Sequence, residues 1–437
     1  PDGGNMEFSY DDNIRRVTLT ERNGSKIVYL HDEKYRNTET IYEDGTKEKY
    51  VYNDKNQCIL RTDRLGRTTR MSYDNKGNLT QMVDASKRRT NFTYDANNHL
   101  VSMSMNGKER LKNHYDAKGN LIGSESLYGN GVSVQNDSKG RPEVVTHADG
   151  SRMVLSYDEK GNIKTIQDVS GGVTSYRYDA LNRVVETRDA NENITAFGYD
   201  ETDHVTSVTD AMGNTREYRY NKGGKVVALK DFDGKEVTFT YNAIGKMESY
   251  RDKEGHEVRF SYDKMWNMSQ VIAPDGGIQS YFYNQDNRLE KQILPMGGEV
   301  SYTYDAVGNK TSVTDPDGNT KTFVYDALNR VTEEIEADGA KTSYEYDKEG
   351  NLVKVTDALN QEVSYTYDDL GRRNSVTDAL GATTSLYYNN MGKVERICYP
   401  NGSSTVYSYE AGGRVKSVRY PDGNGEAYRY DAKGNLM

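Results

Sequence analysis

The chain has 437 residues, a formal net charge of −10 and an apolar content of 34%, below the ~45–50% of ordinary globular domains. Its Lys and Arg residues are scattered and no run of about 18 apolar residues occurs, so we expect neither a nucleic-acid partner nor a membrane span. Disorder is excluded as well, because the 36 Tyr residues stand at regular positions and disordered segments contain few aromatic residues.

A tyrosine recurs every 21 residues from Tyr10 to Tyr430, with no insertion or deletion. Of the 21 positions in this register 19 hold Tyr, and His31 and Asn136 are the exceptions. The next residue is Asp in 15 positions, Asn in five and Glu in one. A fixed period of this length indicates a repeat architecture in which each unit packs against its neighbours.

Each unit starts with a turn and a strand, as residues 314–336 illustrate. Residues 315–318 (DPDG) have the preferences of a type I turn, with Asp first, Pro second and Gly fourth. Residues 319–325 place Phe323 and Tyr325 on one face and β-branched residues on the other, which predicts a strand. Gly fills 17 of the 21 equivalent turn positions, and an aromatic residue stands two before the tyrosine position in 16 of 21 units. The aromatic columns are therefore expected to form ladders along the array.

A second turn and a second strand complete the unit. Residues 326–329 (DALN) follow the same turn pattern, with Asn where other units have Gly, and residues 330–335 form the second strand. Apolar residues in this strand are spaced by three, as in Val205 and Val208 or Val415 and Val418. This spacing breaks strict alternation and predicts a bulge or a strong twist.

The predicted fold is all-β, with antiparallel hairpin repeats of period 21 over a single array, residues 1–437. Two strands per unit give about 42 strands in one continuous sheet, and open sheets beyond ~10 strands curl or split because their twist accumulates. The ribbon should therefore wind into a curled sheet, a spiral or a hollow shell. A parallel β-helix stays open as an alternative, although its coils turn corners instead of reversing at both strand ends. A leucine-rich horseshoe is excluded because its L-x-x-L-x-L spacing is missing.

The units YDALNRVVETRDA (178–190), YDAVGNKTSVTDPDGNT (304–320) and YDALNRVTEEIEADG (325–339) resemble the YD repeats of the RHS (rearrangement hotspot) family. This family includes bacterial polymorphic toxins, the cocoon-forming subunits of insecticidal toxin complexes, and the teneurins. The resemblance covers essentially the whole chain. It implies a hollow β-spiral shell, which in the toxins encloses a C-terminal effector domain.

The register defines a set of structural repeat residues, and the resemblance implies a set of partners. The repeat columns are represented by Tyr73, Asp74, Gly77, Tyr178, Asp179, Tyr304, Asp305, Gly308, Tyr325, Asp326, Tyr346, Asp347 and Gly350. The implied partners are an enclosed toxin, effector or other cargo domain, with a secretion apparatus or an immunity protein, and the implied location is secreted or at a bacterial cell surface. The core segment and toxin that follow the repeats in toxin members are not in this sequence, so we expect a segment of a longer chain.

Catalytic, metal and cofactor sites are not expected. The histidines show no spacing that brings two of them together on one strand face, as a metal site would require. The six are His31, His99, His114, His147, His204 and His256. Asp-rich turns such as 315–319 superficially resemble calcium loops, but the turn preferences already account for their Asp and Gly. Paired carboxylates recur in every unit, whereas catalysis needs one perturbed constellation. We therefore predict a protein that is not an enzyme and binds no cofactor.

Two functions remain after these exclusions. The leading hypothesis is a structural shell that encapsulates a cargo or a C-terminal toxin domain. The alternative is an extracellular adhesion or carbohydrate-binding scaffold, because exposed aromatic ladders would suit a glycan. Trp266, the only tryptophan, replaces a turn Gly and is the candidate for a surface contact.

Overall fold

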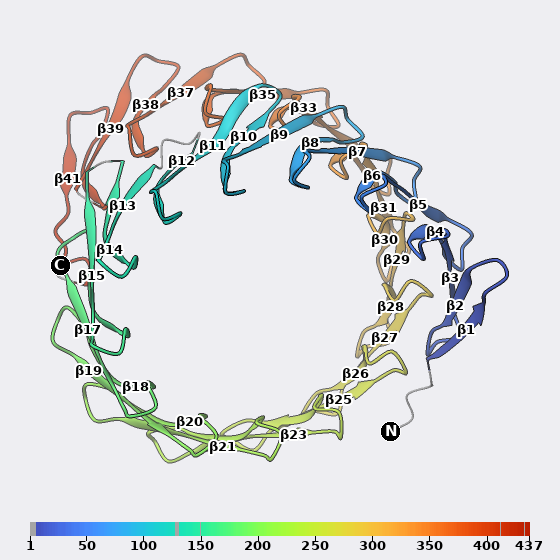
Figure 1. Cartoon of the computed structure of the whole chain (residues 1–437), viewed down its shortest axis with the longest axis horizontal. Coiled ribbons are helices and arrows are strands. Elements are labelled where there is room, and N and C mark those ends of the chain that lie inside the picture. Colours follow the sequence, from blue (N-terminus) through green and yellow to red (C-terminus); the bar gives the residue numbers. More distant parts are fainter. Residues whose placement is uncertain (1–5, 127–130, 149, 411, 432) are drawn as a thin grey trace. The chain divides into compact units, whose positions relative to one another are not determined.

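The computed structural model describes residues 6–126, 131–148, 150–410, 412–431 and 433–437. Every element named in this part of the chain is a strand, and the 41 strands belong to one antiparallel sheet. Strands that pair follow one another in the chain, as β30 (Lys310–Thr314) with β31 (Thr320–Tyr325) and β31 with β32 (Val331–Ile335). Figure 1 shows the hairpins following one another along the ribbon. The predicted all-β, antiparallel hairpin array is confirmed.

The odd-numbered strands end at or near the tyrosine position and are called strand a of their units. They are β1 (Glu7–Asp11), β3 (Lys26–His31), β5 (Lys47–Tyr52), β7 (Thr68–Tyr73), β9 (Arg89–Tyr94), β11 (Lys108–Tyr115), β13 (Val132–Asn136), β15 (Arg152–Tyr157), β17 (Val173–Tyr178), β19 (Ile194–Tyr199), β21 (Thr215–Tyr220), β23 (Glu236–Tyr241), β25 (Glu257–Tyr262), β27 (Ile278–Tyr283), β29 (Glu299–Tyr304), β31, β33 (Lys341–Tyr346), β35 (Glu362–Tyr367), β37 (Thr383–Tyr388), β39 (Ser404–Tyr409) and β41 (Gly425–Ala427).

The even-numbered strands are called strand b. They are β2 (Arg16–Thr20), β4 (Asn37–Ile41), β6 (Cys58–Thr62), β8 (Leu79–Val83), β10 (Leu100–Met105), β12 (Leu121–Ser126), β14 (Pro142–His147), β16 (Ile163–Gln167), β18 (Val184–Arg188), β20 (Val205–Thr209), β22 (Val226–Lys230), β24 (Met247–Arg251), β26 (Met268–Ile272), β28 (Leu289–Ile293), β30, β32, β34 (Leu352–Thr356), β36 (Arg373–Thr377), β38 (Val394–Cys398) and β40 (Val415–Arg419).

Strands β31 (6 residues) and β32 (5 residues) are each one residue shorter than the sequence predicts, because the adjoining turns use their first residues. The turn before strand a is called turn A, and in the unit above it spans 315–318. Its fourth residue, Gly318, donates its N–H to the carbonyl of Asp315 (3.0 Å), and Asp315 donates to the carbonyl of Asn319 (2.9 Å). Gly318 has φ = 85°, the left-handed region that favours glycine. Asn319 therefore closes the turn instead of starting the strand.

The turn after the tyrosine is called turn B and spans 326–329 in the same unit. It has the same pattern, with Asn329 at φ = 63° and a bond from the Asp326 N–H to the carbonyl of Arg330 (2.9 Å). In the hairpin that turn B closes, Tyr325 of β31 pairs with Val331 of β32, but Val324 pairs with Glu333. The register therefore shifts by one residue, and β32 contains the extra residue. The same shift recurs in most hairpins, for example between Gly198 and Tyr199. The bulge predicted in strand b is confirmed.

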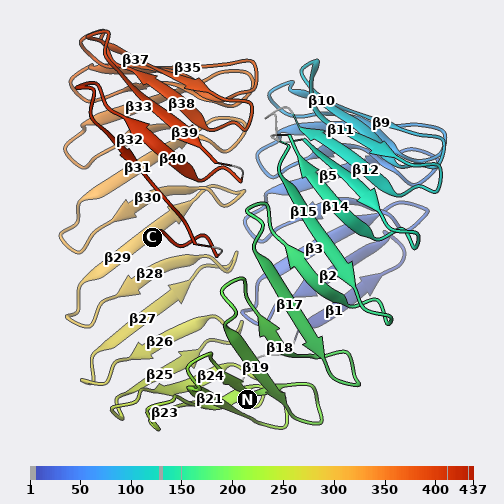
Figure 2. The same cartoon turned by 90° about the vertical axis from the view of Figure 1, so that its left-hand side faces the viewer.

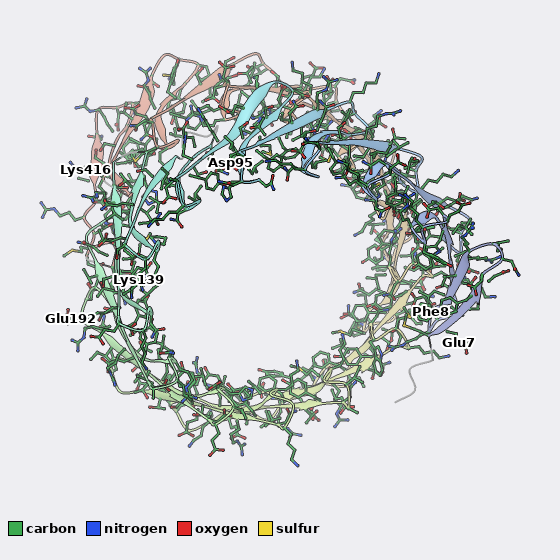
Figure 3. The ribbon with its side chains drawn as sticks, viewed as in Figure 1. Glu7, Phe8, Asp95, Lys139, Glu192 and Lys416 are labelled. Carbon is green, nitrogen blue, oxygen red and sulfur yellow. The ribbon has the colours of Figure 1, made fainter. Side chains whose placement is uncertain are left out.

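The sheet has almost no deep core. Among the described residues only four apolar side chains are buried, and they are Leu19, Val144, Ala228 and Val418. Most other strand residues are half-buried, and side chains project from both faces of the ribbon (Figure 3). The low apolar content is therefore matched by an architecture that derives its stability from neighbouring strands.

The chain forms two compact units, each made mainly of two stretches that are distant in sequence. Unit 1 contains residues 1–92, 105–107 and 238–361, and unit 2 contains residues 93–104, 108–237 and 362–437. In Figure 2 strands β26 to β31 of unit 1 lie side by side in chain order. Within unit 1, Arg64 contacts Asp286, 222 residues later. Within unit 1 the ribbon thus returns onto itself, and the curling predicted from its length is confirmed there.

Candidate functional site

The tyrosine column fastens each unit to the one before it. In 15 of the described units the tyrosine hydroxyl donates a hydrogen bond to the backbone carbonyl 15 residues earlier, at the start of the preceding strand b. Tyr325, for example, donates to the carbonyl of Lys310 at 2.7 Å. Burial raises the pKa of the Tyr325 hydroxyl. The tyrosines therefore form an internal ladder, and the free aromatic platform that would suit a glycan is not formed by this column.

The aspartate after the tyrosine organises turn B. Oδ1 of Asp326 accepts the N–H groups of Leu328 (2.8 Å) and Arg330 (3.1 Å), while Oδ2 accepts the Arg330 Nε (2.7 Å). Side-chain and backbone hydrogen bonds of this kind lower the pKa values of several aspartates of the column, such as Asp74 and Asp116. The hydrogen bond from the Arg36 side chain lowers the pKa of Asp32 to about 2, although desolvation opposes it. The carboxylates are thus used to hold the turns.

A third column, five residues after the tyrosine position, was missed from sequence. All 21 positions hold Arg, Lys, His, Asn or Gln, each of which can donate a hydrogen bond. Arg183 binds Asp179 (2.8 Å) and Asp203 (2.8 Å), and its guanidinium lies 4.7 Å from the centroid of the Tyr199 ring in the next unit. The column therefore connects the turn of one unit with the tyrosine of the next, and its fixed donor character was the signal that could have revealed it.

Two of the histidines belong to this donor column, which explains their shared repeat position. His99 Nδ1 lies 2.9 Å from Asp95, and its ring stacks on Tyr115 with centroids 4.7 Å apart. His204 has the same arrangement with Asp200 and Tyr220, whose ring centroid is 4.5 Å away. Among the residues that the structure describes, no group of three or more His, Cys, Asp or Glu side chains is placed to hold a metal ion.

Turns A of the first stretch of unit 1 contact turns B of its second stretch, and this contact is called the seam. Arg64, in turn A 63–66, binds Asp44 (2.8 Å) and Asp286 (3.0 Å), and it lies 4.0 Å over the Tyr42 ring. Its side chain is only 8% exposed. Arg67 next to it donates to the carbonyl of Ala327 (3.2 Å) and to Asn329 Oδ1 (2.8 Å). The seam is therefore formed by arginines of one edge that bind acceptors of the other.

Unit 2 has a seam of the same polarity. Arg414, the donor-column residue that follows a turn B of the second stretch, donates to Ser170 Oγ in a turn A of the first stretch (2.7 Å). Lys433 Nζ pairs with Asp189 Oδ2 (2.5 Å). Asn191 donates to Asp431 Oδ2 (2.9 Å), and the side-chain hydrogen bonds from Asn435 and Asn191 lower the pKa of Asp431 to about 2. In both units, then, turn A of the earlier stretch meets turn B of the later one.

A cavity of about 500 Å³ lies along the seam of unit 1. Its charged lining is paired internally: Arg61 binds Glu48 (2.7 Å), Arg67 binds Asp63 (2.7 Å) and Arg64 binds the aspartates described above. Ala327 and Leu328 contribute apolar surface. The pairing of the lining charges supports a structural role for this cavity.

The residues singled out from sequence occupy repeated structural positions. The hydroxyls of Tyr73, Tyr178, Tyr304, Tyr325 and Tyr346 all make the backbone bond described above. The side chains of Asp74, Asp179, Asp305, Asp326 and Asp347 accept N–H groups of their own turns B. Positive φ values occur at Gly77 (100°), Gly308 (105°) and Gly350 (99°). These residues lie in successive units and do not converge on one point.

Trp266 is half-buried rather than exposed, which corrects the expectation from its turn position. It adopts φ = 66°, and Arg22 of the other stretch of unit 1 lies 6.0 Å from its ring. The tryptophan is therefore part of the seam. The described residues also contain no helix long and apolar enough to cross a bilayer.

Comparisons with known proteins agree with this architecture. The teneurin YD-shell family model matches residues 190–325, and the RHS repeat model matches residues 52–89, 157–194, 325–360, 346–383 and 388–425. No curated protein matches the sequence significantly.

Several solved toxin-complex structures share the fold. TcdB2-TccC3 without its hypervariable C-terminal region is 16% identical, with 95% of this chain and 29% of that chain covered and a TM-score of 0.63. TcdB2-TccC3 is 16% identical, and the match covers 99% of this chain and 30% of that chain with a TM-score of 0.62. A Tc holotoxin pore of Photorhabdus luminescens is 15% identical, and the match covers 98% of this chain and 29% of that chain with a TM-score of 0.55.

The present chain thus spans less than a third of the length of these toxin-complex chains. The repeat period, the hairpin geometry and the two family models lead to one assignment. The chain belongs to the RHS family and consists of its YD repeats.

Proposed function

We propose that this chain is part of the wall of a shell that encloses another polypeptide, such as a toxin or effector domain. The observation that carries the proposal is the seam. Strands pair along the ribbon, and Arg64 and Arg67 bind across its edges in unit 1. A sheet that is joined in both directions is a continuous barrier, which is what enclosure requires.

The distribution of the carboxylates supports a structural role without catalysis. Carboxylates with a lowered pKa recur in several units, as Asp32 and Asp431 illustrate, and their partners are turn N–H groups and neighbouring side chains. An active site needs one distinctive constellation instead. By analogy with the TcdB2-TccC3 toxin complexes, we propose that the chain acts in an exported bacterial toxin.

The proposal can be tested by protease protection of the native gene product, expressed with every segment to which this chain is naturally joined. The enclosed polypeptide should resist a protease that cleaves it rapidly in isolation. Replacing Arg64 and Arg67 together by Ala should open the seam and increase cleavage. The matched control is Arg70→Ala, because Arg70 is exposed on β7.

Cryo-electron microscopy of the same product should show protein density inside the shell. Cleavage as fast as that of the isolated segment, together with an empty interior, would refute enclosure. Under the alternative function, an adhesion or carbohydrate-binding scaffold, binding on a glycan array would depend on exposed rings such as Phe232, which is 65% exposed.

A further inference from the structure

The tyrosine column is interrupted at two positions, and the structure compensates for only one of them. His31 stands at the first. Its backbone N–H donates to the carbonyl of Arg15 (3.0 Å), just before β2, and its ring Nδ1 lies 3.4 Å from the same oxygen. Asn136 stands at the second, and its side-chain nitrogen is buried without a hydrogen-bond partner in the described part of the chain.

Asn136 ends β13, so β13 lacks the bond that ties strand a of other units to the strand before it. Elsewhere in unit 2, Tyr178 makes this bond to the carbonyl of Ile163 at 2.7 Å. The corresponding carbonyl for position 136 is that of Leu121, at the start of β12. A buried amide without a partner costs more than a missing bond, because it has given up its bonds to water as well. The interface between β12 and β13 is therefore weakened.

The backbone pairing of β13 is also reduced on both sides. The described residues of β12 and β13 form two pairs, at Gly123 and Ser124 of β12, whereas β18 and β19 form three. On the other side Asn136 pairs with Pro142 of β14, which has no N–H to donate. The strand is thus held less firmly than strand a of a regular unit.

The opposite face of the sheet is hollow at the same place. A cavity of about 480 Å³ lies over β11 to β14, and His114, Gly123, Ser133 and His147 contribute to its lining. A Cβ added to Gly123 would lie 3.4 Å from the carbonyl oxygen of Val132 and 3.5 Å from the His114 ring, which is room for a methyl group. Glycine weakens a strand because it brings no side chain to pack. Missing packing on one face thus adds to the missing bond on the other.

We propose that β13 is a built-in point of opening of the ribbon, where β13 separates from β12 while the neighbouring hairpins of unit 2 stay paired. The opening is local because each repeat depends mainly on its neighbours, and segments of low local stability open first. In a shell of the proposed kind, the wall would part first at this interface. The proposal itself does not depend on the enclosure of a cargo.

The test is native-state hydrogen exchange of the native gene product, read by mass spectrometry. Amides of β12 and β13 should have protection factors about ten-fold lower than those of β18 and β19, because Tyr199 in β19 keeps its bond to the carbonyl of Val184 (2.7 Å). Both strand pairs belong to unit 2, so the comparison is internal.

Asn136→Tyr should restore the missing bond and raise the protection of β12 and β13 about ten-fold. The same setting accommodates a tyrosine elsewhere in unit 2, because Tyr178 follows Asn162 of the donor column as Asn136 follows Asn120. Gly123→Ala adds a methyl group on the opposite face and should slow exchange in the same two strands, by a smaller factor.

The matched control is the reverse change, Tyr199→Asn. It should create a second point of opening at β18 and β19 and leave exchange in β12 and β13 unchanged. Circular dichroism verifies that each variant is folded.

Equal protection of the two strand pairs in the parent protein would overturn the proposal. So would rapid exchange in β12 and β13 that Asn136→Tyr fails to slow. Slower exchange throughout unit 2 by one common factor in Asn136→Tyr would overturn it as well, since that result means global rather than local opening.

Discussion

Replacing Tyr325 by Phe removes one hydroxyl and leaves the ring in place. The lost group donates a 2.7 Å hydrogen bond to the carbonyl of Lys310 in the preceding strand. Because this bond recurs along the array, one substitution measures what the tyrosine column contributes to each unit. The change alters neither the turn nor the pairing of β31 with β30.

The expected cost is about 1 kcal/mol, because a net intramolecular hydrogen bond contributes ~0.5–1.5 kcal/mol and the half-buried carbonyl retains some access to water. Tyr325→Ala also removes the ring. We expect ~2–3 kcal/mol for that change, less than the ~3–5 kcal/mol of a fully buried aromatic side chain, because Tyr325 is half-buried. The cost should be local, since repeats couple mainly to their neighbours.

Native-state hydrogen exchange resolves both the size and the location of the effect. Amides of β30 and β31 should exchange about five-fold faster in Tyr325→Phe, as a difference of about 1 kcal/mol implies. Tyr302→Phe is the matched control, because its hydroxyl lies 3.5 Å from Gln292 Oε1, at the limit of a hydrogen bond. Equal effects of the two substitutions, or faster exchange in remote repeats, would refute the reasoning.

Three further results are expected. Arg64→Ala should cost about 2 kcal/mol, because hydrogen bonds to charged groups contribute ~1.5–3 kcal/mol, and it should speed exchange at the turn containing Asp286; unchanged exchange there would contradict the seam. The pKa of Asp32 is lowered to about 2 by its hydrogen bond with the Arg36 side chain, so its stabilisation is complete above about pH 4 and is lost as the pH falls toward 2. Asp32→Asn should therefore show a shallower loss of stability in acid titration, and an unchanged slope would count against this role. A double-mutant cycle of Arg183→Ala with Tyr199→Leu should give a coupling of about 0.5–1 kcal/mol, and no coupling would mean that the stacked pair contributes nothing.

The hairpin could be predicted because its signals are local. The Asp and Gly of residues 315–318 specify a turn, alternation through Tyr325 specifies a strand, and the spacing of Val205 and Val208 specified the bulge. The donor column was missed although it is equally regular, because its residues vary between Arg, Lys, His, Asn and Gln. Their common property is the ability to donate a hydrogen bond, which a search for identical residues overlooks.

Trp266 shows why the placement of exposed groups was less predictable. A turn residue is ordinarily solvated, so its position favoured exposure. Its actual neighbour, Arg22, is 244 residues earlier by sequence numbering. Whether a turn residue is covered depends on which part of the ribbon returns to it, and that information is not contained in one repeat.

The sequence by itself determined the unit, its two reversals, the tyrosine ladder and the family, since all of these are encoded within 21 residues or in their repetition. Only the tertiary structure decided which turns meet across the seams. The contact between Arg64 and Asp286 depends on twist summed over many strands, and a small change per strand would move Arg64 to a different partner. The physical reason is that local signals fix each hairpin, whereas accumulated curvature fixes the seam.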